Sequence, residues 1–429
     1  MKNLDFLQFY PYLTYKEKQL HIEGFPISKF AQKQETPFFL FLPKRFNQNF
    51  EGMKNGISKH IPNFLIAYAL KANYLGRVLD KASSMELGAE VMSLFELKLA
   101  KKANFPTDKI VFNGPAKSLE ELNFAISEGI KHLNVDSFNE LKTIEEVAKN
   151  KNHIQPITIR IHPQLSEETE KRLLIKKNSK LGIDFSRGVK LYEYAKKSSY
   201  LNPVGIHVHV GTNLISHDFY EELLIFFNNY IIELEKKLQI EIKEINLGGG
   251  LASGSSLDLN NFNFTKLGEQ LAKHIENYES KLFIFEPGRY LIEDSFVAVT
   301  KTLRLKKSWG RKWAFTDIGA NSLIPMRYTL YKIIPAIDKG KGQYTNVGGP
   351  LCLPVDVISN EAVDFEIEEN DLLVVLNCGA YTISMSEQFG YPRPAIYELE
   401  DGGKLKLIKA ADDLNQMVED EFSFRKTSE

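Results

Sequence analysis

The sequence predicts an α/β protein in which a (β/α)8 barrel of the TIM type is followed by a mostly antiparallel β-domain. Between about residues 64 and 290, eight short apolar runs alternate with segments of helical periodicity, as expected for βα units around a parallel sheet. Each run ends on polar, charged or glycine residues, and barrels of this type carry their chemistry at those strand ends. After about residue 300 the pattern changes to short runs rich in Val, Ile and Tyr separated by turn signals.

The eight predicted strands can be read directly from the chain. In order they are FLIAYALK (64–71), MELGAEVM (85–92), KIVFNG (109–114), KHLNVD (131–136), PITIRIH (156–162), PVGIHVHVG (203–211), KEINLGGG (243–250) and LFIFEPG (282–288). Their polar ends are Lys71, Glu90, Asn113, Asp136, Arg160 with His162, His207 with His209, Gly248 to Gly250, and Glu286. The sequence therefore predicts a polar rim on an apolar barrel.

Side-chain alternation within these strands predicts which residues face the barrel interior. Ala67, Ala69 and Lys71 share one face of the first strand, so small side chains leave space beside the lysine. The same alternation places His207 and His209 together on one face of the sixth strand.

Three segments are expected. Residues 1–43 contain the hairpin-like TYKEKQLHIEGFPI and are predicted to add strands to the C-terminal β-domain. Residues 44–300 form the barrel, and residues 301–429 form the β-domain.

Composition favours a small-molecule enzyme. The 54 basic and 55 acidic residues nearly cancel, so no overall field attracts nucleic acid or an anionic membrane surface. The first twenty residues interrupt their apolar positions with charges and Pro11, so neither a signal peptide nor a spanning helix is predicted there. Two cysteines, Cys352 and Cys378, are too few for a disulfide framework. We expect a cytoplasmic protein in which any important cysteine acts as a thiol.

Lys71 suggests the chemistry. A lysine at a strand end is usually a solvated cap, but one enclosed by barrel side chains loses hydration and can form a Schiff base with a carbonyl compound or with pyridoxal 5′-phosphate (PLP). The glycines of NLGGGLASG let backbone N–H groups approach a phosphate, although most glycine runs are merely turns. In EPGRY, Glu286 can hold a proton on a pyridine nitrogen and Arg289 can reach a phosphate, whereas the simpler interpretation is a turn beside a surface ion pair.

Two other classes of protein remain open from the residues alone. The His207-x-His209 pair with Glu286 also suits a metal-dependent barrel hydrolase, although such a site has no need for the triple glycine or for Arg289. A non-enzymatic cofactor carrier is the third possibility, and it would not need a large β-domain with a placed thiol. Paired strand histidines are, in addition, often ordinary core residues.

These motifs resemble one family over nearly the whole chain: the alanine-racemase-fold PLP decarboxylases, which include diaminopimelate, ornithine and arginine decarboxylases. The diaminopimelate branch is the most similar. The matching segments, in order, are TPFFLFLPKRF, YALKANY, VFNGPAKS, VDSFNEL, SKLGID, GIHVHVGTN, NLGGG, EPGRY, DIGANSLI, GGPLC and CGAY.

The resemblance implies a role for each matching residue. Lys71 would bind the cofactor covalently, His209 would stack on its ring, and Glu286 would contact the pyridine nitrogen. Cys352 would protonate the α-carbon from the partner subunit, so the resemblance implies a homodimer with shared active sites. The implied phosphate ligands are Thr212, Gly249, Gly250, Arg289 and Tyr381, and the implied acidic neighbours of the cofactor are Glu90 and Glu96.

The substrate end departs from the family pattern. In the diaminopimelate enzymes the cysteine is followed by Glu, but this chain has Leu353 there and retains only Asp356. The family arginine after the DxGxN segment is replaced by Pro325, with Arg327 two residues further on. Arg327 and Asp356 are therefore the candidate substrate residues. These changes favour a carboxylate-tailed conjugate, as in siderophore-type biosynthesis, over the alternative substrate meso-diaminopimelate.

Overall fold

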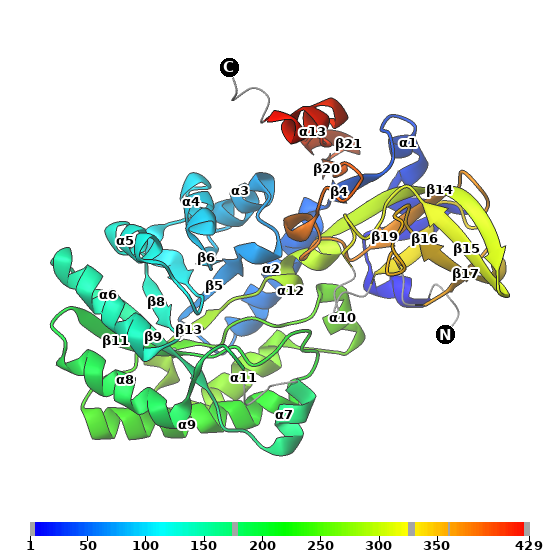
Figure 1. Ribbon diagram of the computed structural model, residues 1–429. Coiled ribbons are helices and arrows are strands. Elements are labelled where there is room, and N and C mark those ends of the chain that lie inside the picture. The colour runs from blue at the N-terminus through cyan, green and yellow to red at the C-terminus, as the bar shows by residue number, and fades with distance from the viewer. Residues whose placement is uncertain (1–4, 174–178, 325–330, 359–360, 424–429) are drawn as a thin grey trace. The chain divides into compact units, whose positions relative to one another are not determined.

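The computed structural model describes residues 5–173, 179–324, 331–358 and 361–423 (Figure 1). The chain divides into two compact units: Gln48–Leu291, and Met1–Asn47 together with Ile292–Glu429. The sequence had placed the boundaries of the barrel segment at residues 44 and 300.

The first unit is a closed barrel of eight parallel strands, as predicted. These are β5 (Phe64–Ala69), β6 (Gly88–Val91), β7 (Ile110–Phe112), β8 (His132–Val135), β9 (Gln155–His162), β11 (Leu201–His207), β12 (Glu244–Asn246) and β13 (Leu282–Phe285). Pairing of β13 with β5 and of β8 with β9 closes the sheet. The two-residue strand β10 (Ile183–Asp184) pairs in parallel with the C-terminal end of β9 and was not predicted.

One helix precedes the first barrel strand and the others follow the strands, and the longer helices cover the outside of the sheet (Figure 1). They are α2 (Pro43–Ile57), α3 (Gly76–Ser84), α4 (Leu94–Lys102), α5 (Leu119–Ser127), α6 (Phe138–Asn150), α7 (Glu167–Leu173), α8 (Phe185–Lys197), α9 (Asp218–Leu238), α10 (Gly254–Leu259), α11 (Phe264–His274) and α12 (Arg289–Ile292). Among the described residues, no helix is long and apolar enough to cross a membrane.

Three successive helices begin with the same Ser-x-x-Glu signal, which fixes where each leaves the rim. The serine oxygen at each N-cap accepts the backbone N–H of the glutamate three residues on, at 3.3, 3.2 and 3.2 Å. The pairs are Ser93 with Glu96 in α4, Ser118 with Glu121 in α5, and Ser137 with Glu140 in α6.

The second unit is mostly antiparallel β-structure. Its large sheet contains β4 (Phe38–Phe41), β14 (Phe296–Ser308), β15 (Arg311–Thr316), β16 (Lys332–Pro335), β17 (Lys341–Gly348), β18 (Val363–Phe365), β19 (Leu372–Leu376), β20 (Ala395–Glu400) and β21 (Lys404–Lys409). The N-terminal hairpin forms a separate small sheet of β1 (Leu13–Lys16), β2 (Gln19–Ile22) and β3 (Phe25–Pro26), next to α1 (Ile27–Ala31). Helix α13 (Leu414–Glu421) follows β21.

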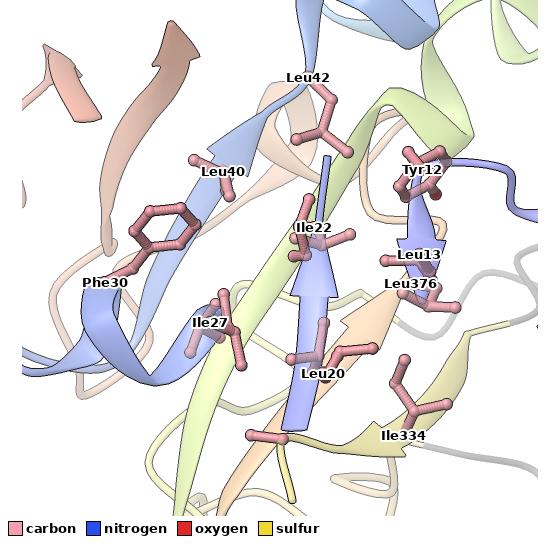
Figure 2. Packing of buried hydrophobic residues seen from close by; sticks show 14 of the residues in the cluster. Tyr12, Leu13, Leu20, Ile22, Ile27, Phe30, Leu40, Leu42, Ile334 and Leu376 are labelled. Atoms are coloured by element: carbon pink, nitrogen blue, oxygen red, sulfur yellow. The ribbon is translucent and has the colours of Figure 1, made fainter. Parts of the chain in front are cut away.

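The N-terminal segment joins the second unit in two ways, as the fold prediction required. Strand β4 lies between β14 and β20, antiparallel to the former and parallel to the latter. The small sheet shares a hydrophobic core with the large one, and Figure 2 shows Leu13, Leu20, Ile22, Leu40, Ile334 and Leu376 packed together. Full burial of each such side chain stabilises the fold by about 1.5–3 kcal/mol.

Candidate active site

Lys71 lies just after the end of β5, in a short 3₁₀ turn (Leu70–Ala72). Its ammonium forms an ion pair with Glu90, the penultimate residue of the neighbouring strand β6. The Lys71 side chain is 31% exposed whereas that of Glu90 is fully buried, so the amine lies at the open end of the barrel. A small molecule that enters there can reach this amine.

Glu286 follows β13 and is a buried carboxylate at the same end of the barrel. Its oxygens accept hydrogen bonds from the side-chain amides of Asn246 at 2.7 Å and Asn113 at 3.0 Å. His207 Nε2 lies 3.5 Å from Glu286 Oε2.

Burial raises the pKa of Glu286, but His207, the Lys71 ammonium and the Asn246 amide outweigh burial and hold it well below its usual range. Burial also lowers the pKa of His207, so this imidazole is neutral, and the Lys71 ammonium and the Asn246 amide remain to keep the pKa of Glu286 low. Glu286 is therefore an anionic acceptor, suited to a protonated ring nitrogen.

The triple glycine lies where other residues would not fit. An added Cβ at Gly248, Gly249 or Gly250 would lie 2.3, 2.2 or 2.2 Å from a backbone oxygen of Val208, Glu286 or Gly211, respectively. Gly248 and Gly250 also adopt positive φ angles of 65° and 99°. The loop after β11, which carries Thr212, is tied to this turn by the 2.9 Å bond from Leu214 N–H to Gly250 O. Only glycine therefore fits at these three positions, and the turn carries no side chain that would keep a phosphate away from its backbone.

His209 lies two residues beyond the end of β11, not on the strand as predicted. Its Nδ1 accepts the Gly249 N–H at 3.2 Å, so the ring is held beside the glycine turn. Burial among barrel side chains and the positive charges of Arg160 and Lys71 lower the pKa of His209. His209 is exposed to solvent, so the two positive charges explain its lowered pKa better than burial does. A neutral flat ring at this place suits stacking on a cationic cofactor.

Glu96 is buried close to the Lys71–Glu90 pair and accepts the Met92 N–H at 2.8 Å. Burial raises the pKa of Glu96 to about 7 and Glu90 acts in the same direction, whereas the Met92 N–H and Lys71 oppose the rise. Arg289, the first residue of α12, is also buried.

The remaining predicted site residues lie in the second unit or outside the described residues. Cys352 is exposed, and Tyr381 has a positive φ of 59°, which is unusual for a bulky side chain. Asp356 is buried, and its two oxygens accept the N–H groups of Ala320 and Leu351, both at 2.7 Å. Asp356 thus anchors the backbone next to Cys352. Arg327 lies outside the described residues.

Sequence reasoning missed the side-chain amides that hold the carboxylates. Asn134 in β8 and Asn246 in β12 are buried polar residues inside apolar strands, and Thr158 in β9 is another. Asn113 was noted as a strand end but was given no role. A polar residue that interrupts a buried strand near its C-terminal end is the signal that would have found them.

These residues fit PLP. The Lys71 amine can react with the aldehyde of PLP, and the Glu286 carboxylate, whose pKa is lowered, can pair with the protonated pyridine nitrogen. The glycine turn admits a phosphate without a Cβ obstruction. Among the described residues, no group of three or more His, Cys, Asp or Glu side chains has an arrangement that could hold a metal ion.

Such a barrel and site define a PLP enzyme of the alanine-racemase fold. The model of the family described as "Pyridoxal-dependent decarboxylase, pyridoxal binding domain" matches residues 47–293, and the chain belongs to this family. It is thus a PLP-dependent amino-acid decarboxylase, and this membership replaces the hydrolase and carrier alternatives.

Three similar proteins share the name diaminopimelate decarboxylase. The diaminopimelate decarboxylase of Aquifex aeolicus is 30% identical over 419 residues, which cover 96% of this chain and 98% of that protein. A crystal structure of the Methanocaldococcus jannaschii enzyme has a TM-score of 0.87 at 28% identity and covers 95% of this chain and 96% of that one. The Helicobacter pylori enzyme, complexed with L-lysine, has a TM-score of 0.83 at 27% identity and covers 92% and 99% of the two chains.

Proposed function

We propose that this chain removes one carboxylate of meso-diaminopimelate. The observation that carries the proposal is similarity to diaminopimelate decarboxylases over nearly the full length of both chains. The sequence alone ranked a carboxylate-tailed conjugate first. We reverse that order because none of these relatives is named for siderophore assembly, whereas all are named for the alternative substrate.

Each site residue has a role in this proposal. Lys71 holds the cofactor aldehyde, and the glycine turn with Thr212 and Arg289 receives its phosphate. Glu286, fixed by Asn246, accepts a hydrogen bond from the ring nitrogen. When bound, PLP supplies an electron-withdrawing ring that accepts the electron pair left as carbon dioxide departs. An acid must then protonate the α-carbon, and we assign this to the Cys352 thiol of a partner subunit.

A second candidate substrate rests on Leu353. This side chain is 37% exposed and follows Cys352, where the resemblance leads us to expect a glutamate. An apolar residue there cannot pair with a free distal ammonium, so the favoured tail would carry a carboxylate without an amine. Amino acids conjugated to citrate or a similar acid fit this description. The dimer with shared sites and the cytoplasmic location remain predictions.

Two measurements test the proposal. Borohydride reduction of the purified holoenzyme should fix PLP to the peptide that contains Lys71, and Lys71→Ala should abolish both labelling and turnover while leaving the circular dichroism unchanged. Carbon dioxide release should then be measured from meso-diaminopimelate, lysine, ornithine, arginine and citryl-conjugated amino acids. Preferred turnover of meso-diaminopimelate supports the first candidate. Turnover of the conjugates alone would replace it with the second.

A further inference from the structure

We propose that Asn113 is a positioning residue that holds the Lys71 partner Glu90 and the ring-nitrogen acceptor Glu286 with a single amide group. Its Nδ2 donates to Glu90 Oε1 at 2.8 Å and to Glu286 Oε2 at 3.0 Å. The inference rests on the proposed use of Glu286 at the cofactor ring, although not on the identity of the substrate.

The orientation of this amide follows from its neighbours. A carboxylate can only accept hydrogen bonds, so the Asn113 atom between two carboxylates must be the nitrogen, which has one N–H for each. The Asn113 Oδ1 is then left to accept, and Asn134 Nδ2 donates to it at 2.5 Å. The same logic turns Asn134 Oδ1 toward the hydroxyl of Thr158, which hydrogen-bonds to it. Side chains from β8 and β9 thereby fix the orientation of the Asn113 amide, which directly follows β7.

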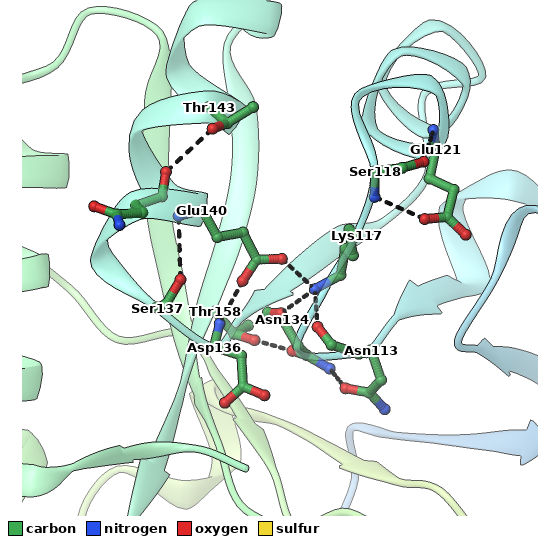
Figure 3. A network of polar contacts seen from close by, with 12 residues as sticks. Asn113, Lys117, Ser118, Glu121, Asn134, Asp136, Ser137, Glu140, Thr143 and Thr158 are labelled. Atoms are coloured by element: carbon green, nitrogen blue, oxygen red, sulfur yellow. Dashed lines mark hydrogen bonds and ion pairs between the residues drawn. The ribbon is translucent and has the colours of Figure 1, made fainter. Parts of the chain in front are cut away.

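A buried lysine supports the row of side chains formed by Asn113, Asn134 and Thr158 (Figure 3). Lys117 Nζ donates to the backbone oxygens of Gly114 and Asn134 at 2.8 Å each and to Glu140 Oε1 at 2.6 Å. The Lys117 side chain is 1% exposed. Because Gly114 directly follows Asn113, the lysine holds the backbone of Asn134 and the backbone next to Asn113, so the row is already held in place by the protein itself.

The row has a specific consequence for the cofactor. Without the amide, Glu90 and Glu286 would lie close together with no donor between them. Asn246 would then be the remaining amide on Glu286, and the Glu286 oxygen that Asn113 had held could turn away from its place. A hydrogen bond to a charged group contributes more than a neutral one, so loss of this donor should weaken PLP binding by about 10- to 100-fold. Through Glu286, loss of the Asn113 amide should weaken only the part of PLP binding that depends on the ring nitrogen.

The test compares PLP with deazapyridoxal 5′-phosphate, in which carbon replaces the ring nitrogen. Asn113→Leu keeps the number and branching of the side-chain non-hydrogen atoms and removes the hydrogen bonds. We expect its apoenzyme to lose at least about tenfold more affinity for PLP than for the deaza cofactor, measured by titration of the visible absorption band. Asn123→Leu, on the outer helix α5, is the matched control and should change neither affinity.

Thr158→Val provides a second variant should Asn113→Leu fold poorly. It exchanges a hydroxyl for a methyl group at the far end of the row and leaves the carboxylate contacts in place. Its affinity for PLP should also fall more than its affinity for the deaza cofactor, but by less than in Asn113→Leu. If both variants lost equal affinity for PLP and for the deaza cofactor, the row would only support the fold, and the inference would be overturned. Failure of wild-type protein to label at Lys71 would instead contradict the proposed function.

Discussion

Glu244 should control the acid stability of the barrel from the end opposite the active site. It begins β12, and its carboxylate lies 2.7 Å from Lys131 Nζ and 2.8 Å from His132 Nδ1, at the start of β8. Burial raises the pKa of Glu244, but His132 and Lys131 outweigh burial and lower it from the ordinary value of 4.5 to about 2. This folded-state pKa is depressed, so its stabilisation is complete above pH 4.5 and is lost as the pH falls toward 2.

The magnitude follows from that shift. Each pKa unit corresponds to about 1.36 kcal/mol, so the shift contributes at most about 3 kcal/mol to the free energy of unfolding. Glu244→Gln should therefore be less stable than wild type by up to this amount above pH 4.5, and the difference should vanish near pH 2.

Urea unfolding across this pH range measures the effect. The helical circular dichroism signal reports mainly on the barrel unit, whereas the two tryptophans, Trp309 and Trp313, lie in the other unit and report on it by fluorescence. Glu241→Gln is the control, because the Glu241–Lys243 pair is exposed and should contribute about 0–1 kcal/mol. A stability difference for Glu244→Gln that does not change with pH would refute the assigned linkage.

Two further predictions concern the site. Mixing inactive Lys71→Ala subunits with inactive Cys352→Ala subunits should restore part of the activity if each site takes its thiol from the partner, and a fully active monomer would contradict this. Glu96 has a folded pKa raised from 4.5 to about 7, so wild type loses stability as the pH rises through that interval. Glu96→Gln should therefore gain stability relative to wild type, by on the order of 1–3 kcal/mol above pH 7, and parallel pH curves for the two proteins would argue against a buried titrating carboxyl.

The sequence predicted the barrel because its strands are short apolar runs with polar ends, and this pattern needs no knowledge of pairing. It also brought Lys71, Glu90 and Glu286 to one rim, since all parallel strands end there. The row from Asn113 to Thr158 was out of reach, because it depends on which side chains of three separate strands meet inside the barrel. His209 was placed on a strand that ends earlier, at His207.

Long-range pairing limited the prediction of the second unit. The hairpin at residues 14–27 was recognised from local turn signals, but nothing local to FFLF shows that β4 pairs with both β14 and β20. The substrate end was limited in a different way. The family resemblance identifies Leu353 as a departure, but the sequence does not show that Asp356 already accepts two backbone N–H groups.

The position of β4 has a consequence for synthesis on the ribosome. This strand emerges early, yet one of its two partners, β20, is among the last strands to be made. The barrel is continuous in sequence and is complete before then, so it can fold while β4 still exposes unpaired backbone groups and apolar side chains. At ordinary elongation rates that delay lasts on the order of tens of seconds. A nascent chain that stalls before Ala395 would keep one edge of β4 open, and such truncated chains should be the ones that chaperones retain.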